Sequence, residues 1–288
     1  MGTYNVIVTC RNSEENIKSA LTSLINQSIS PKYIIVVDDG SKDNTPKLLK
    51  DIQSDTNNLY IITNPDMGYS IGRVVQNWNK ALRFAKELNL EKTDYHMIAT
   101  DDTQYEADYC EKIIRNMDSN ISLAIASGNF DNNHYVTPHG AGRLVRNSFF
   151  CNSHGYYPEK MGYESIVLHT ANQMGFTYKV IPEARFLHTR ELGSNHNFYE
   201  FGASMRTLGY HPLFALGRIL IYFVSGKPIG RLGSLSMFYY YLSYRPRKEG
   251  YDSMFDETTR RSIRNDQAKR IRSFRAKRIR RFIGLNKS

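Results

Sequence analysis

The sequence predicts an α/β protein with a Rossmann-like, mainly parallel sheet flanked by helices. Apolar segments of strand length alternate with segments of helical periodicity. Acidic pairs follow two of the apolar segments: Asp38–Asp39 after Tyr33–Val37, and Asp101–Asp102 after Tyr95–Thr100. In open α/β sheets, ligands bind beyond the carboxyl ends of the strands. Both pairs are therefore expected to share one crevice, where four carboxylates need a cation or hydrogen-bond donors to offset their repulsion.

The first elements follow in the order that this fold requires. Residues 5–9 read as a strand, and Asn12 and Glu15 have the spacing of a capping box at the start of a helix. Apolar residues then recur at helical spacing: Ile17, Ala20, Leu21, Leu24 and Ile25. After the second strand, residues 43–46 are expected to begin another helix because Pro46 suits a first turn.

Three further strands and two helices complete the first half. A strand at residues 59–63 precedes a loop from Asn64 to Gly68 and a helix to about Leu88. After the strand that precedes Asp101, a helix at 107–117 and a strand at 123–128 are expected.

Residues 129–162 are rich in Gly, His, Asn and aromatic residues, a composition that favours a binding surface made of loops. A helix at 164–174, a strand at 177–182 and the segment 186–190 are expected next.

The bulk composition allows one large α/β domain, or one domain with an appended module. The 288 residues contain three widely spaced cysteines, Cys10, Cys110 and Cys151, which fit neither a disulfide framework nor a metal site. A reducing compartment is therefore expected. Because a strand pattern begins at Tyr4, no signal peptide is expected.

The net charge of +10 is concentrated in the C-terminal tail. Residues 245–288 hold 15 Lys/Arg and 5 Asp/Glu, whereas residues 1–244 hold 23 of each sign. Residues 260–283 would place apolar side chains on one helical face and basic ones on the other, which favours binding to an anionic membrane surface. The apolar set comprises Ile263, Ala268, Ile271, Phe274, Ile279 and Phe282. Nucleic-acid binding and a solvated, disordered tail remain alternatives.

Residues 198–244 are aromatic and apolar but are interrupted by Arg206, Arg218, Lys227 and Arg231. The most apolar stretch, 212–225, is too short to span a bilayer. Core helices and a position on a bilayer surface are both compatible with this composition.

An ordered series of motifs resembles the family 2 glycosyltransferases, which have the GT-A fold. The series begins with residues 6–12 and Val36-Val37-Asp38-Asp39-Gly40-Ser41, and continues with residues 98–102, 142–144 and 162–164. The resemblance covers about residues 3–190. It implies inverting transfer of a sugar, of the hexosyl type, from a nucleotide-diphosphate sugar to a hydroxyl acceptor.

The resemblance also divides the chain and suggests its surroundings. A catalytic domain would cover 1–196, with a nucleotide-binding half at 1–128 and an acceptor half at 129–196. An apolar helical segment at 197–256 and the basic tail at 257–288 would follow. Together with the tail, the resemblance implies a lipid-linked or surface-glycan acceptor and a cytoplasmic enzyme, peripheral on the inner face of the cell membrane.

The family assigns roles to matching residues. Thr9, Arg11, Asp39, Arg73 and Asp101 would contact the nucleotide, and Asp39 would bind its base. Asp102 and His188 would hold Mg²⁺ or Mn²⁺ on the diphosphate, where the ion would neutralise the leaving group.

Two positions depart from the family pattern. Thr100 stands where an Asp is common, and Ser165 replaces the Asp of the usual Glu-Asp pair. Glu164 is therefore the expected general base, with Glu159 in reserve.

Structural roles are open for the same residues. The acidic pairs could form a turn and a helix cap, and Arg73 could lie on a solvated face. Glu164 could simply favour a first helical turn, and His188 could be a hydrogen-bonded core residue.

Two other functions are weighed. A nucleotidyltransferase usually has a Gly-rich loop after its first strand, and residues 9–13 contain no glycine. Nucleic-acid binding is disfavoured because the clustered carboxylates would repel a phosphate backbone.

Overall fold

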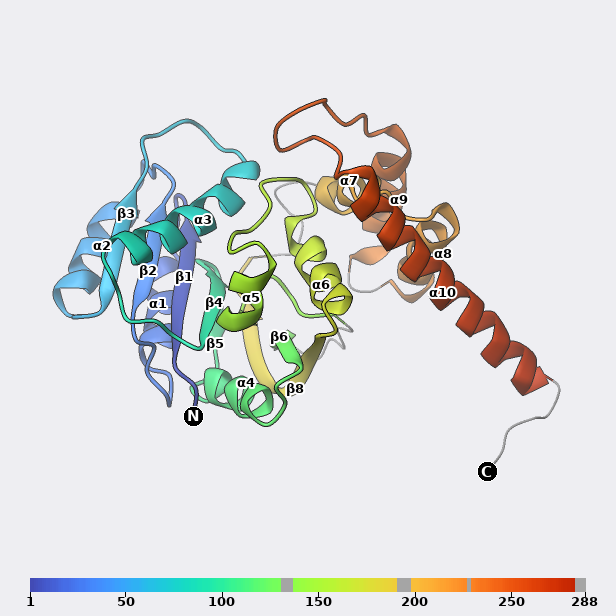
Figure 1. Cartoon of the computed structure of the whole chain (residues 1–288). Coiled ribbons are helices and arrows are strands. Elements are labelled where there is room, and N and C mark those ends of the chain that lie inside the picture. The colour runs from blue at the N-terminus through green and yellow to red at the C-terminus, as the bar shows by residue number, and fades with distance from the viewer. Residues whose placement is uncertain (131–136, 191–197, 227–228, 283–288) are drawn as a thin grey trace. The chain divides into compact units, whose positions relative to one another are not determined.

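A computed structural model describes residues 1–130, 137–190, 198–226 and 229–282, with side chains described as far as residue 272. The chain forms two compact units (Figure 1). The first comprises Met1–Glu159 and Tyr163–Glu191, and the second comprises Lys160–Gly162 and Leu192–Ser288. The expected boundary at residue 196 lies outside the described residues.

Within the described residues, the first unit contains one eight-stranded sheet in the order β3-β2-β1-β4-β7-β6-β8-β5. β1 pairs in parallel with β2 and β4, and β2 with β3. These four strands are β1 (Tyr4–Cys10), β2 (Ile34–Asp38), β3 (Leu59–Thr63) and β4 (Tyr95–Thr100).

The other half of the sheet is mixed. β7 is antiparallel to β4 and β6, β5 is antiparallel to β8, and β6 is parallel to β8. Their bounds are β5 (Thr103–Tyr105), β6 (Leu123–Phe130), β7 (Arg143–Arg146) and β8 (Thr177–His188). The predicted mainly parallel α/β sheet is confirmed.

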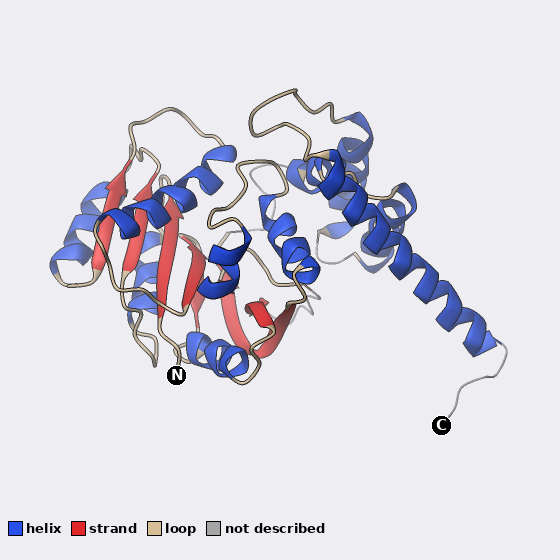
Figure 2. Ribbon diagram, in the orientation of Figure 1, coloured by secondary structure: helices blue, strands red, loops and turns tan. Residues whose placement is uncertain are grey.

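Helices cover both faces of this sheet, with α3 crossing one face and α1 lying on the other (Figure 2). Apolar residues of α1, including Leu21 and Leu24, pack with Val6 and Val8 in the main core. The helices are α1 (Ile17–Ile25), α2 (Thr45–Ser54), α3 (Gly72–Glu87), α4 (Tyr109–Asp118), α5 (Asn147–Ser153) and α6 (Tyr163–Gln173).

The expected capping box at Asn12 and Glu15 is wrong. α1 begins only at Ile17, and Asn12 has a φ of 46°. The Asn12 side-chain oxygen instead accepts from the backbone N–H of Lys42, across the loop after β2. Asn12 therefore joins two loops at the carboxyl edge of the sheet rather than starting a helix.

The loop region expected at 129–162 contains β7 and α5. The strand was missed because Arg143 and Arg146 are charged, yet both are buried. Their guanidinium groups donate to backbone carbonyls, including Pro138 O and Met117 O, which compensates their burial. The two segments expected at 177–182 and 186–190 are one strand, β8, with a register irregularity against β6.

The second unit is helical. Three of its helices enclose a small core of Met205, Ala215, Ile219, Ile229, Met237 and Tyr241. No helix in the described part of the chain is long and apolar enough to cross a membrane. The helices are α7 (Tyr199–Thr207), α8 (Pro212–Ser225), α9 (Gly230–Ser243) and α10 (Glu257–Phe282).

The basic tail is helical, but the expected separation into apolar and basic faces is wrong where side chains are described. Ile263 and Gln267 are buried against their own unit, and Gln267 accepts from His211 N. Arg264 lies on the same side, donating to Gly209 O. The inward face of α10 thus mixes apolar, polar and basic groups. The side chains of Phe274, Ile279 and Phe282 lie outside the described ones.

Candidate active site

The two acidic pairs lie at the same edge of the sheet, one strand apart. Cys10, the last residue of β1, pairs with Asp38 of β2, and Thr9 pairs with Thr100 of β4. Because β1 lies between β2 and β4, the two pairs are two inter-strand spacings apart, about 10 Å. Burial raises the pKa of Cys10, and nearby carboxylates raise it further, with contributions from Asp101, Asp38, Asp43 and Asp39. The end of β1 is thus flanked by negative charge on both sides.

The two carboxylates of the first pair, Asp38 and Asp39, have different partners. Asp38 is buried, and its Oδ1 accepts from both the N–H and the hydroxyl of Ser41, so it supports the turn. The turn hypothesis therefore holds for Asp38. The Asp39 carboxylate instead pairs with Arg73, whose Nε lies 3.0 Å and 2.9 Å from its two oxygens.

Arg73 is not on a solvated face. Its side chain is 13% exposed and that of Asp39 is 7% exposed. Asn64 Nδ2 donates to the same carboxylate, and Lys80 Nζ donates to Asn64 Oδ1. This network fixes the orientation of the Asp39 carboxylate at the edge of the sheet.

Arg11 links two loops above this carboxylate. Its Nη1 donates to the backbone oxygens of Asp39 and Gly40, and its Nη2 lies 2.6 Å from Asp66 Oδ1. Lys42 contacts the second Asp66 oxygen, and these two cations lower the pKa of Asp66. The hydroxyl of Thr9 is buried without a hydrogen-bond partner among the described residues. Thr9, Arg11, Asp39 and Arg73 thus gather at one corner of the edge.

Asp101 and Asp102 do not cap a helix, because the short strand β5 follows them directly. Asp101 is buried, and burial followed by the charge of Asp102 raises its pKa to about 6. Arg190 Nη1 lies 3.8 Å from Asp101 Oδ2 and offsets part of this effect. Sequence analysis missed Arg190, although it lies two residues after His188.

Asp102 faces His188 at the end of β8. The Asp102 Oδ1 and His188 Nδ1 atoms lie 3.6 Å apart, and Thr103 Oγ1 lies 3.0 Å from the same nitrogen. Burial alone would raise the pKa of Asp102, but the contact with His188 and its charge lower it. His188 Nε2 is buried with no partner among the described residues, so His188 is not a fully hydrogen-bonded core histidine.

Glu164 lies in the first turn of α6, as an acidic residue favours, and its side chain is 43% exposed. Arg143 donates to the backbone oxygen of Glu164 and approaches its carboxylate at 3.7 Å. Gly140 allows this carboxylate to approach closely, since a Cβ there would lie 2.3 Å from Glu164 Oε1. Glu159 accepts instead from Asn79 Nδ2 of α3.

His139 connects the neighbourhoods of Glu164 and His188, and sequence analysis did not select it. It precedes Gly140, and its ring centroid lies 5.3 Å from that of His188. Burial, then the charges of His188 and Arg143, lower the pKa of His139 to about 3, so it is neutral at physiological pH. His139 thus lies next to Gly140, which the Glu164 carboxylate approaches, and packs on His188, which faces Asp102.

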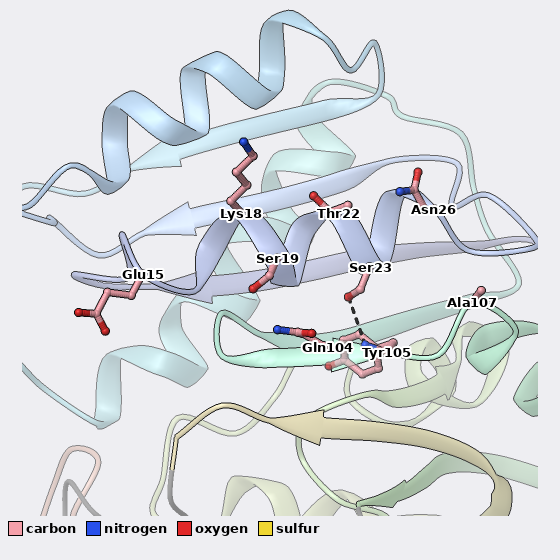
Figure 3. A pocket seen from close by; sticks show the side chains of 9 residues that line it. All are labelled: Glu15, Lys18, Ser19, Thr22, Ser23, Asn26, Gln104, Tyr105 and Ala107. Carbon is pink, nitrogen blue, oxygen red and sulfur yellow. Dashed lines mark hydrogen bonds between the residues drawn. The ribbon is translucent and has the colours of Figure 1, made fainter.

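A polar pocket of about 650 Å³ lies along α1 and β5 (Figure 3). Glu15, Lys18, Ser19 and Thr22 of α1 and its approach line one side, and Gln104 lies opposite. Its lining among the described residues includes none of the predicted site residues. The predicted site is therefore defined by side-chain contacts rather than by this pocket.

Comparison with known proteins identifies the family. The model of the family "Glycosyl transferase family 2" matches residues 5–180, more than half of the chain. The chain belongs to this family. Membership of this family favours glycosyl transfer over the nucleotidyltransferase and nucleic-acid-binding alternatives.

A curated relative and solved structures agree with this assignment. EpsH of Bacillus subtilis (strain 168), itself only provisionally described as a glycosyltransferase, is 27% identical over 123 residues, covering 43% of this chain and 33% of EpsH. The mannosyltransferase PcManGT from Pyrobaculum calidifontis, solved with GDP-Man and Mn²⁺, has a TM-score of 0.59 at 16% identity and covers 84% of this chain and 70% of that one.

TarS from S. aureus has a TM-score of 0.52 at 18% identity, covering 76% of this chain and 40% of TarS. A shorter form of TarS was solved with UDP-GlcNAc. At these identities the structures show a shared GT-A fold. The chain spans about a third of the length of EpsH and two fifths of that of TarS.

Proposed function

We propose that this glycosyltransferase moves a hexosyl group from a nucleoside-diphosphate sugar to a hydroxyl acceptor with inversion of configuration. The observation that carries the proposal is the pair of carboxylate groups flanking the end of β1 within a family 2 fold. On one side the fixed carboxylate of Asp39 is available to a nucleobase, and on the other side Asp102 lies beside the imidazole of His188. A nucleoside and its diphosphate can be bound across such an edge.

Donor binding is assigned to the corner around Asp39. Its carboxylate, held by Arg73 and Asn64, would accept hydrogen bonds from N–H groups of the base. Arg11 and the Thr9 hydroxyl, which has no partner among the described residues, would line the nucleoside pocket, and Asp101 would face the nucleotide with Arg190 beside it. PcManGT with GDP-Man and TarS with UDP-GlcNAc support a nucleotide-sugar donor without fixing its base.

The residues at Asp102 fit a divalent cation. The described residues contain no cluster of three or more His, Cys, Asp or Glu side chains placed to hold a metal, so the protein would supply two ligands. The buried imidazole of His188 retains a nitrogen that no described residue contacts by a hydrogen bond, and Asp102 supplies carboxylate oxygens. These donor types suit Mn²⁺ or Mg²⁺, which take further ligands from substrate phosphates. Such an ion would neutralise the charge of the leaving nucleoside diphosphate.

Glu164 is assigned as the general base. Its carboxylate would take the proton of the acceptor hydroxyl as that oxygen bonds to the anomeric carbon, while the bond to the diphosphate oxygen breaks and its electron pair leaves with the nucleotide. Arg143 would orient Glu164, because its guanidinium donates to the Glu164 backbone and contacts the carboxylate. Glu159, engaged with Asn79, is not assigned this role.

The acceptor and location are proposed from the second unit. A lipid-linked or surface glycan, presented at the inner face of the cell membrane, suits an enzyme whose net charge of +10 lies in its last 44 residues. Residues 273–288 alone contribute six Lys/Arg and no Asp/Glu.

Thermal shift with UDP and GDP, each with and without Mn²⁺, tests the donor and metal assignments. At 100 times the Kd, binding adds about 2.7 kcal/mol, which raises the Tm by roughly 5–10 °C. The shift should require Mn²⁺ in the wild type and disappear in Asp102→Ala. Asp51→Ala, which removes an exposed carboxylate on α2, is the control and should behave like the wild type.

A nucleotide-sugar panel then tests the reaction. Release of nucleoside diphosphate together with a glycosylated product is expected, and an inverted anomeric configuration should be seen by NMR. Release of sugar 1-phosphate would instead indicate nucleotidyl transfer. A Tm shift in Asp102→Ala equal to that of the wild type would contradict the metal assignment.

A further inference from the structure

The second unit exposes two apolar helix faces. On α8, Leu213, Leu216, Leu220 and Val224 recur at i, i+3, i+7 and i+11 and are 42–76% exposed. Ile221 and Phe223 widen this face. On α9 the corresponding residues are Leu232, Leu235, Phe238, Tyr239 and Leu242. These eleven residues are called the α8–α9 apolar surface below.

The exposure of these residues does not reflect a missing core. The opposite faces of the same helices are packed: Ala215 and Ile219 of α8 meet Met237 and Tyr241 of α9 in the small core of this unit. α8 and α9 also pack together in the fold (Figure 1). Each helix therefore has one face packed in the core and one apolar face exposed to solvent, an arrangement typical of an interaction site.

The segment of the chain that carries this surface has charges of one sign. Residues 201–248 contain seven Lys/Arg and no Asp or Glu. Arg231 is exposed and lies on the outward side of α9, within a helical turn of Leu232 and Leu235. An apolar surface set in a purely basic segment complements a partner that is apolar inside and anionic outside. That description fits a bilayer containing anionic lipids.

The dimensions favour a position on the bilayer rather than across it. Each helix has 14 residues and is about 21 Å long, shorter than the roughly 30 Å hydrocarbon core. Tyr239 is of the kind that gathers at the membrane–water boundary, and Phe223 and Phe238 are of the kind that interfacial helices insert. Helices of this kind lie in the interface with their apolar side chains inserted.

We propose that the α8–α9 apolar surface inserts into an anionic lipid bilayer and is the main membrane contact of the protein. The inference deepens the proposed membrane location and rests on that part of the proposed function, but it is independent of the donor chemistry. It assigns insertion to α8 and α9 rather than to α10, whose Ile263 is buried within its own unit.

Co-sedimentation of the full chain with phosphatidylcholine vesicles, with and without phosphatidylglycerol, tests the proposal. Wild-type protein should bind the anionic vesicles and keep a salt-resistant fraction, because insertion is not screened by ions. The double variant Leu220→Lys/Val224→Lys adds positive charge but removes two inserting groups. It should lose the salt-resistant fraction by at least about tenfold, corresponding to about 1.4 kcal/mol.

Matched variants separate the explanations. Ile121→Lys alters a residue of the first unit that is as exposed as Val224, and should bind like the wild type. Changing the five basic residues of 275–281 to Gln tests the tail, and should weaken binding only at low salt. In addition, Phe223→Trp should show blue-shifted fluorescence with anionic vesicles, against the constant signal of the buried Trp78.

Three outcomes would overturn the inference. The Leu220→Lys/Val224→Lys variant could bind vesicles at high salt like the wild type, or the tail variant could lose all binding. Alternatively, light scattering could reveal a dimer that the Leu220→Lys/Val224→Lys change dissociates while vesicle binding persists, making the surface a contact between copies. Donor hydrolysis by each variant in the absence of vesicles reports separately on the glycosyltransferase chemistry, so failure of either proposal is recognised by itself.

Discussion

Replacing Asp39 by asparagine would test the network at the proposed base-binding corner. The carboxylate contacts Arg73 Nε through both oxygens at 3.0 Å and 2.9 Å, and the two side chains are 7% and 13% exposed. Removing one partner of a buried ion pair costs about 3–5 kcal/mol because the other charge remains buried. The amide oxygen of the introduced side chain still accepts one hydrogen bond, so we expect a loss of about 2–3 kcal/mol in the free energy of unfolding.

Urea unfolding of Asp39→Asn, Arg73→Met and the double variant measures this coupling. The double variant should be more stable than the sum of the single losses predicts, with a coupling energy of at least about 1 kcal/mol. The slope of the urea transition should not change. Glu91→Gln, which removes one member of the exposed Lys32–Glu91 pair, is the control and should shift stability by less than about 0.5 kcal/mol.

A coupling energy of less than about 0.5 kcal/mol between Asp39 and Arg73, the range of exposed pairs, would contradict this prediction. Solvent would then screen the pair despite its burial, and Arg73 would not fix the carboxylate. Independently, Asp39→Asn should lose the nucleotide-induced Tm shift even where the protein remains folded.

Four further changes probe the remaining site and the pH dependence of folding. In metal-free buffer, Asp101→Asn should stabilise the fold by about 3 kcal/mol at pH 7, because the raised pKa of Asp101 means that folding at this pH buries an unfavourable charge. Asp102→Asn should destabilise it, since the pKa of Asp102 is lowered. Burial lowers the pKa of His96 to about 4, so the wild type should lose about 3 kcal/mol of stability as the pH falls from 6.5 to 4, and His96→Asn should abolish this pH-dependent loss. Glu164→Gln should reduce sugar transfer by at least about 100-fold and leave donor binding unchanged.

Urea titrations between pH 4 and 7 check the stability changes, and the signs for Asp101 and His96 are opposite. Asp101 favours the fold below pH 3.8, and this contribution is lost as the pH rises through 6. His96 favours the fold above pH 6.5, and this contribution is lost as the pH falls through 4. A destabilised Asp101→Asn variant at pH 7 would mean that the contact with Arg190 outweighs burial. If Glu164→Gln transferred sugar at the wild-type rate, Glu164 would not be the general base.

The sequence located the acidic pairs at the ends of the parallel strands, because the position of each pair depends only on the strand directly before it. A strand followed at once by acidic residues fixes where those residues lie, since parallel strands end at a common edge. Asp39 and Asp102 could therefore be placed near one another from two short segments. The family motifs extended this placement to Thr9 and Arg11, which belong to the end of β1 and the loop after it.

The sequence was less informative where charged residues are buried. Arg143 and Arg146 concealed β7, because their burial is compensated by carbonyl oxygens that are distant in the chain. Asn12 was read as a cap because its spacing to Glu15 is local, while its actual partner is Lys42. His139 and Arg190 had no local signal beyond their residue type.

By itself, the sequence determined the fold class, the family and the edge of the sheet at which the carboxylates gather, since each follows from the order of strands and motifs. Only the tertiary structure decided that Arg73 pairs with Asp39, that Asp101 and Asp102 differ in pKa, and that α8 and α9 turn apolar faces outward. Those properties depend on which distant groups surround a side chain and how far water is excluded from it, and neither can be read from neighbours along the chain.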